Sequence, residues 1–420
     1  MLTFIQLSDI HFRGSDDDEP NVLDYEHRQS LVADIRRVVE DDLQRISGLL
    51  ICGDIADAGD PTQFSQALEW LQGLCADIGL DPWMVWVVPG NHDLDRDRIG
   101  DPQQAHRAAV RAEVGVAADA IFEGLLGDDE KAAELLEPFD NYLELASIYG
   151  CAFDAGALAW RESLSMGKFE VVLKGLASSL LCGRRDNTTD RRMIVGADQA
   201  HFVPEPGLLH YIMCHHPHNW LLDNKDHKRA LRGAHVCVTG HEHRRGLTPS
   251  EGGIYLESGA VSPVRQPDGT YKQDEDPSYA IVALDVEEGD REGTPIAFFR
   301  MAARRRVWIG GAWTEDTRSD GELGRRTAVD GIAAPVEADV EPLGPADVLN
   351  RPKAELRYRL GVLTPDRRNR CAESIGHTAG EIMSVPSFRR TETIFRWAED
   401  EGKLSALWNA ATNKSDQNPF

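Results

Sequence analysis

A formal net charge of −25 on 420 residues disfavours nonspecific binding to nucleic-acid backbones, since that affinity comes largely from basic groups that displace counterions. The first predicted strand starts at Leu2, which leaves no room for a signal peptide. No apolar stretch approaches the roughly 20 residues of a membrane span, so we expect a cytoplasmic protein without membrane contact.

Apolar runs of strand length stop at short polar motifs in five places along the chain. These runs are residues 2–7, 49–52, 84–88, 209–214 and 235–239. Helical spacing of apolar residues separates the first three runs, and Asp60-Pro61 is a favourable N-cap and first position for the second of these helices. Alternating strands and helices predict an α/β sheet, in which ligand sites lie beyond the carboxyl ends of the strands.

The motifs that end the runs supply carboxylate, carboxamide and imidazole groups. In chain order they read Asp9-Ile10-His11, Gly53-Asp54, Gly90-Asn91-His92-Asp93, His215-His216-Pro217 and Gly240-His241-Glu242-His243. Mixed oxygen and nitrogen donors suit divalent transition metals better than calcium, which takes oxygen ligands, or structural zinc, which favours thiolates. Two metals about 3.5–4 Å apart can hold a hydroxide between them and clamp the attacking and leaving oxygens. The motifs therefore predict a two-metal hydrolase site.

The ordered motifs resemble those of the calcineurin-like metallophosphoesterase superfamily over roughly residues 1–312. The resemblance implies an α/β fold of two packed mixed β-sheets flanked by helices, with the metals at the strand ends. The ligands that it implies are Asp9, His11 and His243 for the first metal, Asn91, His215 and His241 for the second, and Asp54 as the bridge between them. It also implies that His92 contacts the phosphate or protonates the leaving group, and that Asp93 orients His92.

The choice between His215 and His216 as ligand rests on the family pattern H-x-P, which favours His215 and leaves His216 to line the pocket. Arg13, His216 and His218 are the candidate substrate contacts, although solvated loop residues are the simpler alternative for Arg13 and His218. Four arginines that flank the polar loop before residue 209 are further candidates for phosphate contacts with the same alternative, namely Arg184, Arg185, Arg191 and Arg192.

Residues 53–60, together with the helix predicted after them, most resemble the corresponding segment of the cyclic-nucleotide phosphodiesterase branch of the superfamily. We therefore expect a phosphodiesterase that acts on a nucleotide-type phosphodiester, with two divalent ions such as Mn²⁺, or Fe or Zn in its place. One alternative is a nuclease acting on DNA or RNA in a bacterial defence system. Another is a non-catalytic metal-binding scaffold whose output is the C-terminal region.

The chain divides into three predicted regions. Residues 1–312 form the metallophosphoesterase domain, which contains an Ala- and acid-rich helical insertion at about 96–168 that either caps the metal site or packs away from it. Helical periodicity in this insertion runs through 105–114, 117–126 and 132–148, and later strand-like runs at 254–259, 279–284 and 296–299 are predicted to close the second sheet.

The acidic composition of residues 313–343, rich in Ala, Gly and Pro, predicts a flexible linker. Residues 344–420 return to amphipathic helical patterns and predict a small all-α domain. This last region resembles the effector-associated, death-domain-like adaptors of bacterial conflict systems, with a generic helical domain as the alternative. We expect it to bind a protein partner or to self-associate.

Overall fold

The computed structural model describes most of the chain. The described residues are 1–14, 19–43, 45–167, 169–184, 191–202, 205, 207–249, 253–266, 268, 270–272, 274–291, 294–316, 327–328, 351–412 and 416–420. Of the predicted linker, residues 317–326 and 329–343 lie outside this part of the chain. None of the helices within it is long and apolar enough to cross a bilayer.

The first β-sheet carries the N-terminal strands at its centre and edge. Its strands are β1 (Leu2–Leu7), β2 (Gly48–Cys52), β3 (Val85–Val88), β10 (Ser278–Arg291), β11 (Thr294–Ile309), β12 (Ala312–Glu315) and β13 (Thr327–Ala328). They follow the order β12-β11-β10-β1-β2-β3, with β13 paired to β11. β1, β2 and β3 are parallel, while β10 pairs antiparallel to β1. β1 to β3 are buried along their whole length, which explains why they read as continuous apolar runs.

The second β-sheet packs against the first. Its strands are β4 (Ala159–Met166), β5 (Phe169–Leu176), β6 (Leu208–Cys214), β7 (Val236–Thr239), β8 (Arg245–Pro249) and β9 (Ile254–Ser258), in the order β4-β5-β6-β7-β9-β8. Tyr211 of β6 donates a hydrogen bond to Gln6 of β1 at 3.2 Å, and the Phe4 and Tyr211 rings lie 6.2 Å apart. Both sheets mix parallel and antiparallel pairs, so the predicted pair of packed mixed sheets is confirmed.

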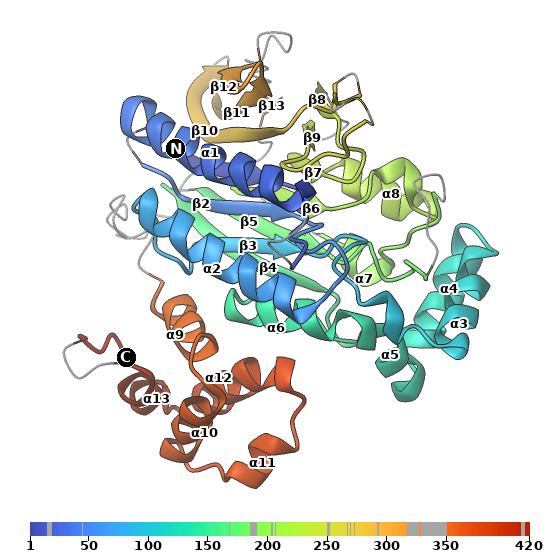
Figure 1. Cartoon of the computed structure of the whole chain (residues 1–420), viewed down its shortest axis with the longest axis vertical. Coiled ribbons are helices and arrows are strands. Elements are labelled where there is room, and N and C mark those ends of the chain that lie inside the picture. The colour runs from blue at the N-terminus through green and yellow to red at the C-terminus, as the bar shows by residue number, and fades with distance from the viewer. Residues whose placement is uncertain are drawn as a thin grey trace.

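Helices cover the sheets. The long helices α1 (Glu19–Asp42) and α2 (Pro61–Asp77) connect β1 to β2 and β2 to β3, and Figure 1 shows both running across the same side of the first sheet. The predicted N-cap of α2 is confirmed: the Asp60 side chain accepts from Thr62 N at 2.7 Å and forms a capping box with Gln63. The short helices η3 (His218–Trp220), α7 (Ala197–Ala200) and α8 (Lys225–Arg232) belong to the second half of the domain.

The insertion after β3 is helical over a shorter range than predicted. Its helices are η1 (Arg96–Arg98), α3 (Asp101–Arg111), α4 (Val116–Leu126), α5 (Asp129–Leu136), η2 (Glu137–Phe139) and α6 (Asp140–Ile148). The single helix predicted at 132–148 is wrong, because Pro138 cannot continue an α-helix and separates α5 from α6. Residues 159–166 form β4, an edge strand whose exposed polar residues hid it from the sequence pattern.

Two later strand assignments also differ from the sequence-based prediction. The runs at 279–284 and 296–299 lie in β10 and β11, which extend the first sheet beside β1 and not the second. Only the run at 254–259, observed as β9, belongs to the second sheet. Which sheet a strand joins depends on contacts between distant parts of the chain, and the local apolar pattern is the same in both cases.

The C-terminal helices form a cluster beside α6, shown in orange and red in Figure 1. They are α9 (Pro352–Gly361), α10 (Pro365–Ser374), α11 (Ala379–Met383), η5 (Ser387–Arg389), α12 (Arg390–Asp400) and α13 (Leu404–Ala411). Leu360, Phe395 and Trp408 lie in a core of their own. Tyr358 of α9 instead packs into the main core, where its hydroxyl accepts a hydrogen bond from Gln72 Nε2 at 2.9 Å. The cluster therefore has its own core and is also docked on the sheet domain.

We predict that Tyr358 holds the C-terminal helices in place. Its ring lies 6.3 Å from Trp83 and 6.2 Å from Tyr149 and is 8% exposed. Tyr358→Phe removes only the hydrogen bond and should lower the free energy of unfolding by about 1 kcal/mol. Tyr358→Ala should lower it by about 3–5 kcal/mol, as for other buried aromatic residues. Urea denaturation measures both changes.

The control is Met383→Ala, because that side chain belongs to the same helical cluster but is 58% exposed. It should change the free energy of unfolding by less than about 0.5 kcal/mol. A Tyr358→Ala loss no larger than that of the control would contradict the docking role.

Candidate metal centre

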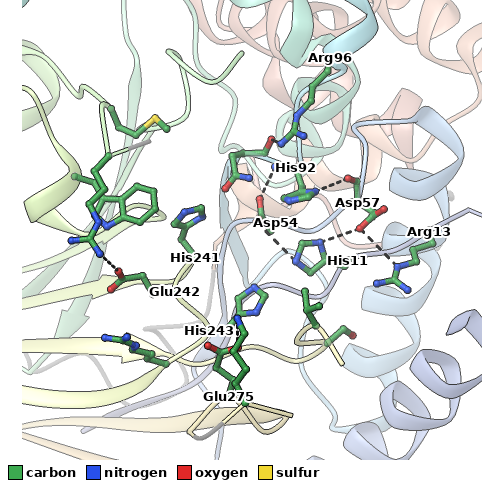
Figure 2. A pocket seen from close by; sticks show the side chains of 18 residues that line it. His11, Arg13, Asp54, Asp57, His92, Arg96, His241, Glu242, His243 and Glu275 are labelled. Atoms are coloured by element: carbon green, nitrogen blue, oxygen red, sulfur yellow. Dashed lines mark hydrogen bonds and ion pairs between the residues drawn. The ribbon is translucent and has the colours of Figure 1, made fainter. Parts of the chain in front are cut away.

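The seven predicted metal ligands lie together where five strands end. They follow the carboxyl ends of β1, β2 and β3 in the first sheet and of β6 and β7 in the second. Figure 2 shows Asp54, His11, His243 and His241 arranged around one space at the base of a pocket. Oδ1 of Asp9 and Nε2 of His243 lie 3.3 Å apart, although 234 positions separate the two residues in the chain. The two packed sheets bring the motifs to one place.

The backbone at five of the seven ligands is left-handed. Asp9, His11, Asp54, His241 and His243 have φ between 51° and 67°. Among the other described non-glycine residues, only one has a positive φ. This conformation costs roughly 1–2 kcal/mol per residue, and such strain concentrates at functional sites. It turns each ligand sharply off the end of its strand.

Two glycines allow the motif loops to touch. Gly53 has φ +85°, and a Cβ built there would lie 2.4 Å from Nδ1 of His215. A Cβ at Gly90 would lie 2.1 Å from Oδ1 of Asp54. Neither position can carry a side chain without displacing a ligand, so both glycines are required for close approach of the loops.

Two buried carboxylates form the centre of the group. Asp9 and Asp54 are 0% and 2% exposed. Oδ2 of Asp54 faces Nε2 of His215 at 3.3 Å and Nε2 of His11 at 4.0 Å. The separation from His215 is within the roughly 3–3.5 Å between two ligand atoms bound to one ion with bonds of about 2.1 Å, and the separation from His11 is about 0.5 Å longer than that range. Asp54 is therefore placed to contact both halves of the centre.

The remaining ligands divide into two sets. Asp9, His11 and His243 offer atoms within 4.8 Å of one another, as expected for the first metal. In the other half, Nε2 of His215 lies 3.3 Å from Oδ1 of Asn91, and the His215 and His241 rings lie 5.2 Å apart. This division is the one that the family resemblance implies.

The hydrogen bonds of His215 leave its inner nitrogen available. Its Nδ1 lies 2.7 Å from the Cys52 carbonyl oxygen, which can only accept, so Nδ1 carries a proton and Nε2 is the nitrogen that faces Asp54 and could bind a metal after losing its own proton. Burial lowers the pKa of this ring, but the charge of Asp54 outweighs burial and raises the pKa to about 9. At His241, burial and the charge of His215 lower the pKa to about 3. The carboxylates thus attract positive charge to the place that His215 faces.

Several buried atoms at this place have no hydrogen-bond partner. They include Oδ1 of Asp9 and Nε2 of His241. A buried polar atom without a partner costs about 1–3 kcal/mol, and a cation bound at each half of the centre would satisfy these atoms. Together with two buried carboxylates, these donors fit divalent metal ions.

His92 lines the pocket beside the ligands, but a different residue orients it than predicted. Its Nδ1 donates to the carbonyl oxygen of Asp57 at 2.7 Å (Figure 2). Asp93, which was predicted to orient His92, is fully buried and accepts instead from Gly90 N and Ala56 N, both at 2.8 Å. Asp93 therefore joins the two motif loops. Its carboxylate is held by these two backbone N–H groups and does not line the pocket.

Asp57 is a site residue that the sequence analysis missed. Besides holding His92, its carboxylate lies 3.5 Å from Nδ1 of His11 and 3.8 Å from Nε of Arg13. The His11 contact draws the pKa of Asp57 below its usual value. Its position three residues after Asp54, on the same loop, was the only signal in the sequence.

A pocket of about 420 Å³ opens above the ligands. Its cationic lining residues are Arg13, Arg96, Arg191, Arg244 and Lys272. Arg13 and Arg191 thus line the pocket as the sequence suggested, whereas the other three were not predicted. In Figure 2, Arg13 and Glu242 lie on opposite sides of the centre, and Glu242 pairs with Arg191 at 3.6 Å.

Two predicted substrate contacts and most of the predicted insertion do not line this pocket. His216 has no exposed surface, and His218 lies outside the lining residues. Arg96 of η1, at the start of the insertion, lines the pocket, whereas helices α3 to α6 contribute none of the described lining residues and so lie beside the pocket.

Comparison with known proteins agrees with the site. A family model for calcineurin-like phosphoesterases matches residues 2–245. The uncharacterized metallophosphoesterase-like protein YydB of Bacillus subtilis (strain 168) is 34% identical over 94 residues, which are 22% of this chain and 18% of that protein. The chain thus spans less than a fifth of that relative's length.

Solved structures with a similar fold share little sequence identity with this chain. Vacuolar protein sorting 29 of Cryptosporidium parvum is 10% identical with a TM-score of 0.31, covering 75% of this chain and 95% of that one. The sulfate thiohydrolase SoxB of Thermus thermophilus is 10% identical with a TM-score of 0.31, covering 68% and 54%. At these TM-scores neither likeness supports a functional argument. The family model, in contrast, covers more than half of the 420 residues, and the chain belongs to the calcineurin-like phosphoesterase family.

Proposed function

We propose that the protein is a metal-dependent phosphodiesterase that hydrolyses a nucleotide-type phosphodiester with two divalent ions, Mn²⁺ being the first to test. The observation that carries this proposal is the pair of buried carboxylates, Asp9 and Asp54, surrounded by imidazoles at the base of a pocket with a cationic lining. When bound, the ions would act as Lewis acids toward the phosphate and lower the pKa of water. Asp9, His11, Asp54, Asn91, His215, His241 and His243 would hold them.

The chain's own residues supply the remaining functions. Because Nδ1 of His92 donates to Asp57, its Nε2 is left for the substrate, where it can contact a phosphate oxygen or give a proton to the leaving oxygen. The cationic side chains around the pocket would bind non-scissile anionic groups, with Arg96 anchored by its hydrogen bond to Asn91 O at 3.1 Å.

The size of the pocket favours a small substrate. Its volume of about 420 Å³ is within the range of roughly 300–1,000 Å³ for sites that take small molecules. The net charge of −25 also opposes binding of long nucleic acids. A nuclease remains the alternative, favoured by the five cationic side chains that line the pocket of an otherwise acidic chain.

The first test is turnover. The metal-loaded protein should hydrolyse bis-p-nitrophenyl phosphate, and EDTA should abolish the reaction because both carboxylates then lose their cations. A panel of cyclic mononucleotides, cyclic oligonucleotides, single- and double-stranded DNA, and RNA would then separate the phosphodiesterase from the nuclease. Folded, metal-loaded protein that cleaves no member of the panel would support the scaffold alternative.

A pair of variants separates metal binding from proton transfer. Asp54→Ala should remove activity together with bound metal, because its carboxylate faces His11 and His215 at once. His92→Ala should keep the metal but lose about 10²–10⁴-fold in rate. Elemental analysis of both purified variants decides the matter. Equal metal loss in the two would show that His92 has been given the wrong role.

A third variant tests the residue behind His11. Asp57→Asn keeps the backbone carbonyl that holds His92 but removes the charge 3.5 Å from Nδ1 of His11. We expect metal affinity to fall about 10–100-fold, the usual effect of removing a partner behind a ligand. Asp77→Asn, an exposed position at the end of α2, is the matched control and should bind metal normally. Equal affinities in the two variants would exclude the role given to Asp57.

A further inference from the structure

One imidazole beside the metal ligands has no role in the arrangement described so far. His216 has no exposed surface, and its Nε2 has no hydrogen-bond partner. Leaving such an atom unpaired in the interior costs about 1–3 kcal/mol. His215, His216 and His241 each offer a nitrogen within 4.8 Å of the others. His216 therefore belongs to a group of three imidazoles at the second metal position.

The hydrogen bonds of His216 define which of its nitrogens is free. Nδ1 lies 2.9 Å from Oγ of Ser178, and the same oxygen accepts from His216 N at 3.2 Å. A hydroxyl oxygen has two lone pairs, so it can also accept the Nδ1 proton. In the tautomer that donates from Nδ1, Nε2 carries a lone pair that can bind a metal.

The spacing of the three rings matches ligands of one ion. Their centroids are 5.0 Å apart for His215 and His216, 4.6 Å for His216 and His241, and 5.2 Å for His215 and His241. For metal–nitrogen bonds of about 2.1 Å and angles of about 90–110°, ring centres should lie roughly 4.5–5.3 Å apart. All three observed separations are within this range.

The same reasoning excludes another group that resembles a metal site. Asp119, Asp223 and His227 also offer atoms within 4.8 Å of one another. There, Nδ2 of Asn224 donates to Oδ2 of Asp119 at 2.8 Å and faces Nε2 of His227 at 3.2 Å. Oδ1 of Asn224 caps α8, so the amide cannot be reversed. Nε2 of His227 then accepts and its Nδ1 carries a proton toward the carboxylates, so this imidazole offers no lone pair to a metal.

We propose that His216 is an additional ligand of the second metal position, beside His215, His241 and Asn91. The proposal rests on the metal centre of the proposed function but not on its substrate. Asp54 would be shared by both positions, so the second would have three imidazoles, the amide oxygen of Asn91 and no carboxylate of its own, whereas the first would have two imidazoles and Asp9. Imidazole suits Zn²⁺ and Fe²⁺, whereas carboxylate and water suit Mn²⁺. The second position should therefore prefer Zn²⁺ or Fe²⁺ over Mn²⁺.

The test compares His216→Asn with His218→Asn in the full chain. His218 is a suitable control, because both of its ring nitrogens also lack partners although it belongs to no ligand group among the described residues. Metal-free proteins are titrated with Zn²⁺ and with Mn²⁺ by calorimetry. His216→Asn should weaken Zn²⁺ binding at one of two positions by at least about tenfold and change Mn²⁺ binding less. His218→Asn should bind both ions like the wild type.

Two further measurements separate a ligand from a packing residue. X-ray absorption at the zinc edge should show fewer imidazoles per zinc in His216→Asn than in the control. Thermal unfolding of the metal-free variants should be the same as that of the wild type, and only the gain in Tm on adding Zn²⁺ should shrink. His216→Gln serves as a second variant if the Asn side chain is too short for the site.

Unchanged Zn²⁺ affinity and an unchanged number of imidazoles in both His216 variants would overturn the proposal. A metal-free Tm that falls as much as the zinc-loaded Tm would also overturn it, because the ring would then act through packing. Neither result depends on turnover. Failure of the proposed function would appear differently, as normal metal binding by the wild type without hydrolysis of any diester.

Discussion

Two carboxylates buried within one small volume are the constraint around which this protein is organised. Asp9 and Asp54 stand at the ends of adjacent parallel strands, almost without solvent, where an uncompensated charge costs several kcal/mol. Backbone N–H groups of His92 and His241 offset part of this cost at 2.7 and 3.2 Å. The imidazoles around them supply further positive or metal-bound charge. The strand order, the packing of the second sheet and the tight loops all serve to bring compensating groups to these two side chains.

The features of this centre that could be predicted from sequence are those that a short stretch of the chain determines by itself. A fully buried strand is a short apolar run, and a ligand at its end is the next polar residue, so β1, β2 and β3 and the motifs behind them were visible. Roles that depend on distant contacts were not. Asp93 accepts a hydrogen bond from Ala56 N on another loop, and His216 does not line the pocket, although both residues are adjacent to predicted ligands in the chain. Adjacency in sequence therefore indicates that a residue is near the metals, but not what its side chain touches.

Helix α6 connects the metal loops with the C-terminal helices. At its first turn, Nδ2 of Asn141 donates to the carbonyl oxygen of Gly59 at 2.8 Å, on the loop that carries Asp54. At its last residue, Ile148 packs so closely on Gly361 of α9 that a Cβ there would lie 2.9 Å away. One helix is thus held by the loop at one end and by the docked cluster at the other. None of the described residues of the cluster lines the pocket, yet the cluster packs on α6, which contacts the loop that carries Asp54.

The left-handed backbone of five ligands limits which sequences this centre can tolerate. Aspartate, asparagine and histidine are several-fold enriched among non-glycine residues with positive φ. They are also the residue types of the predicted metal ligands, so the chemistry and the conformation select the same small set. Glutamate offers the same carboxylate as Asp54 but lacks this conformational tolerance, and a β-branched residue would be worse. Substitution at these positions is therefore restricted both by the ligand chemistry and by the left-handed backbone.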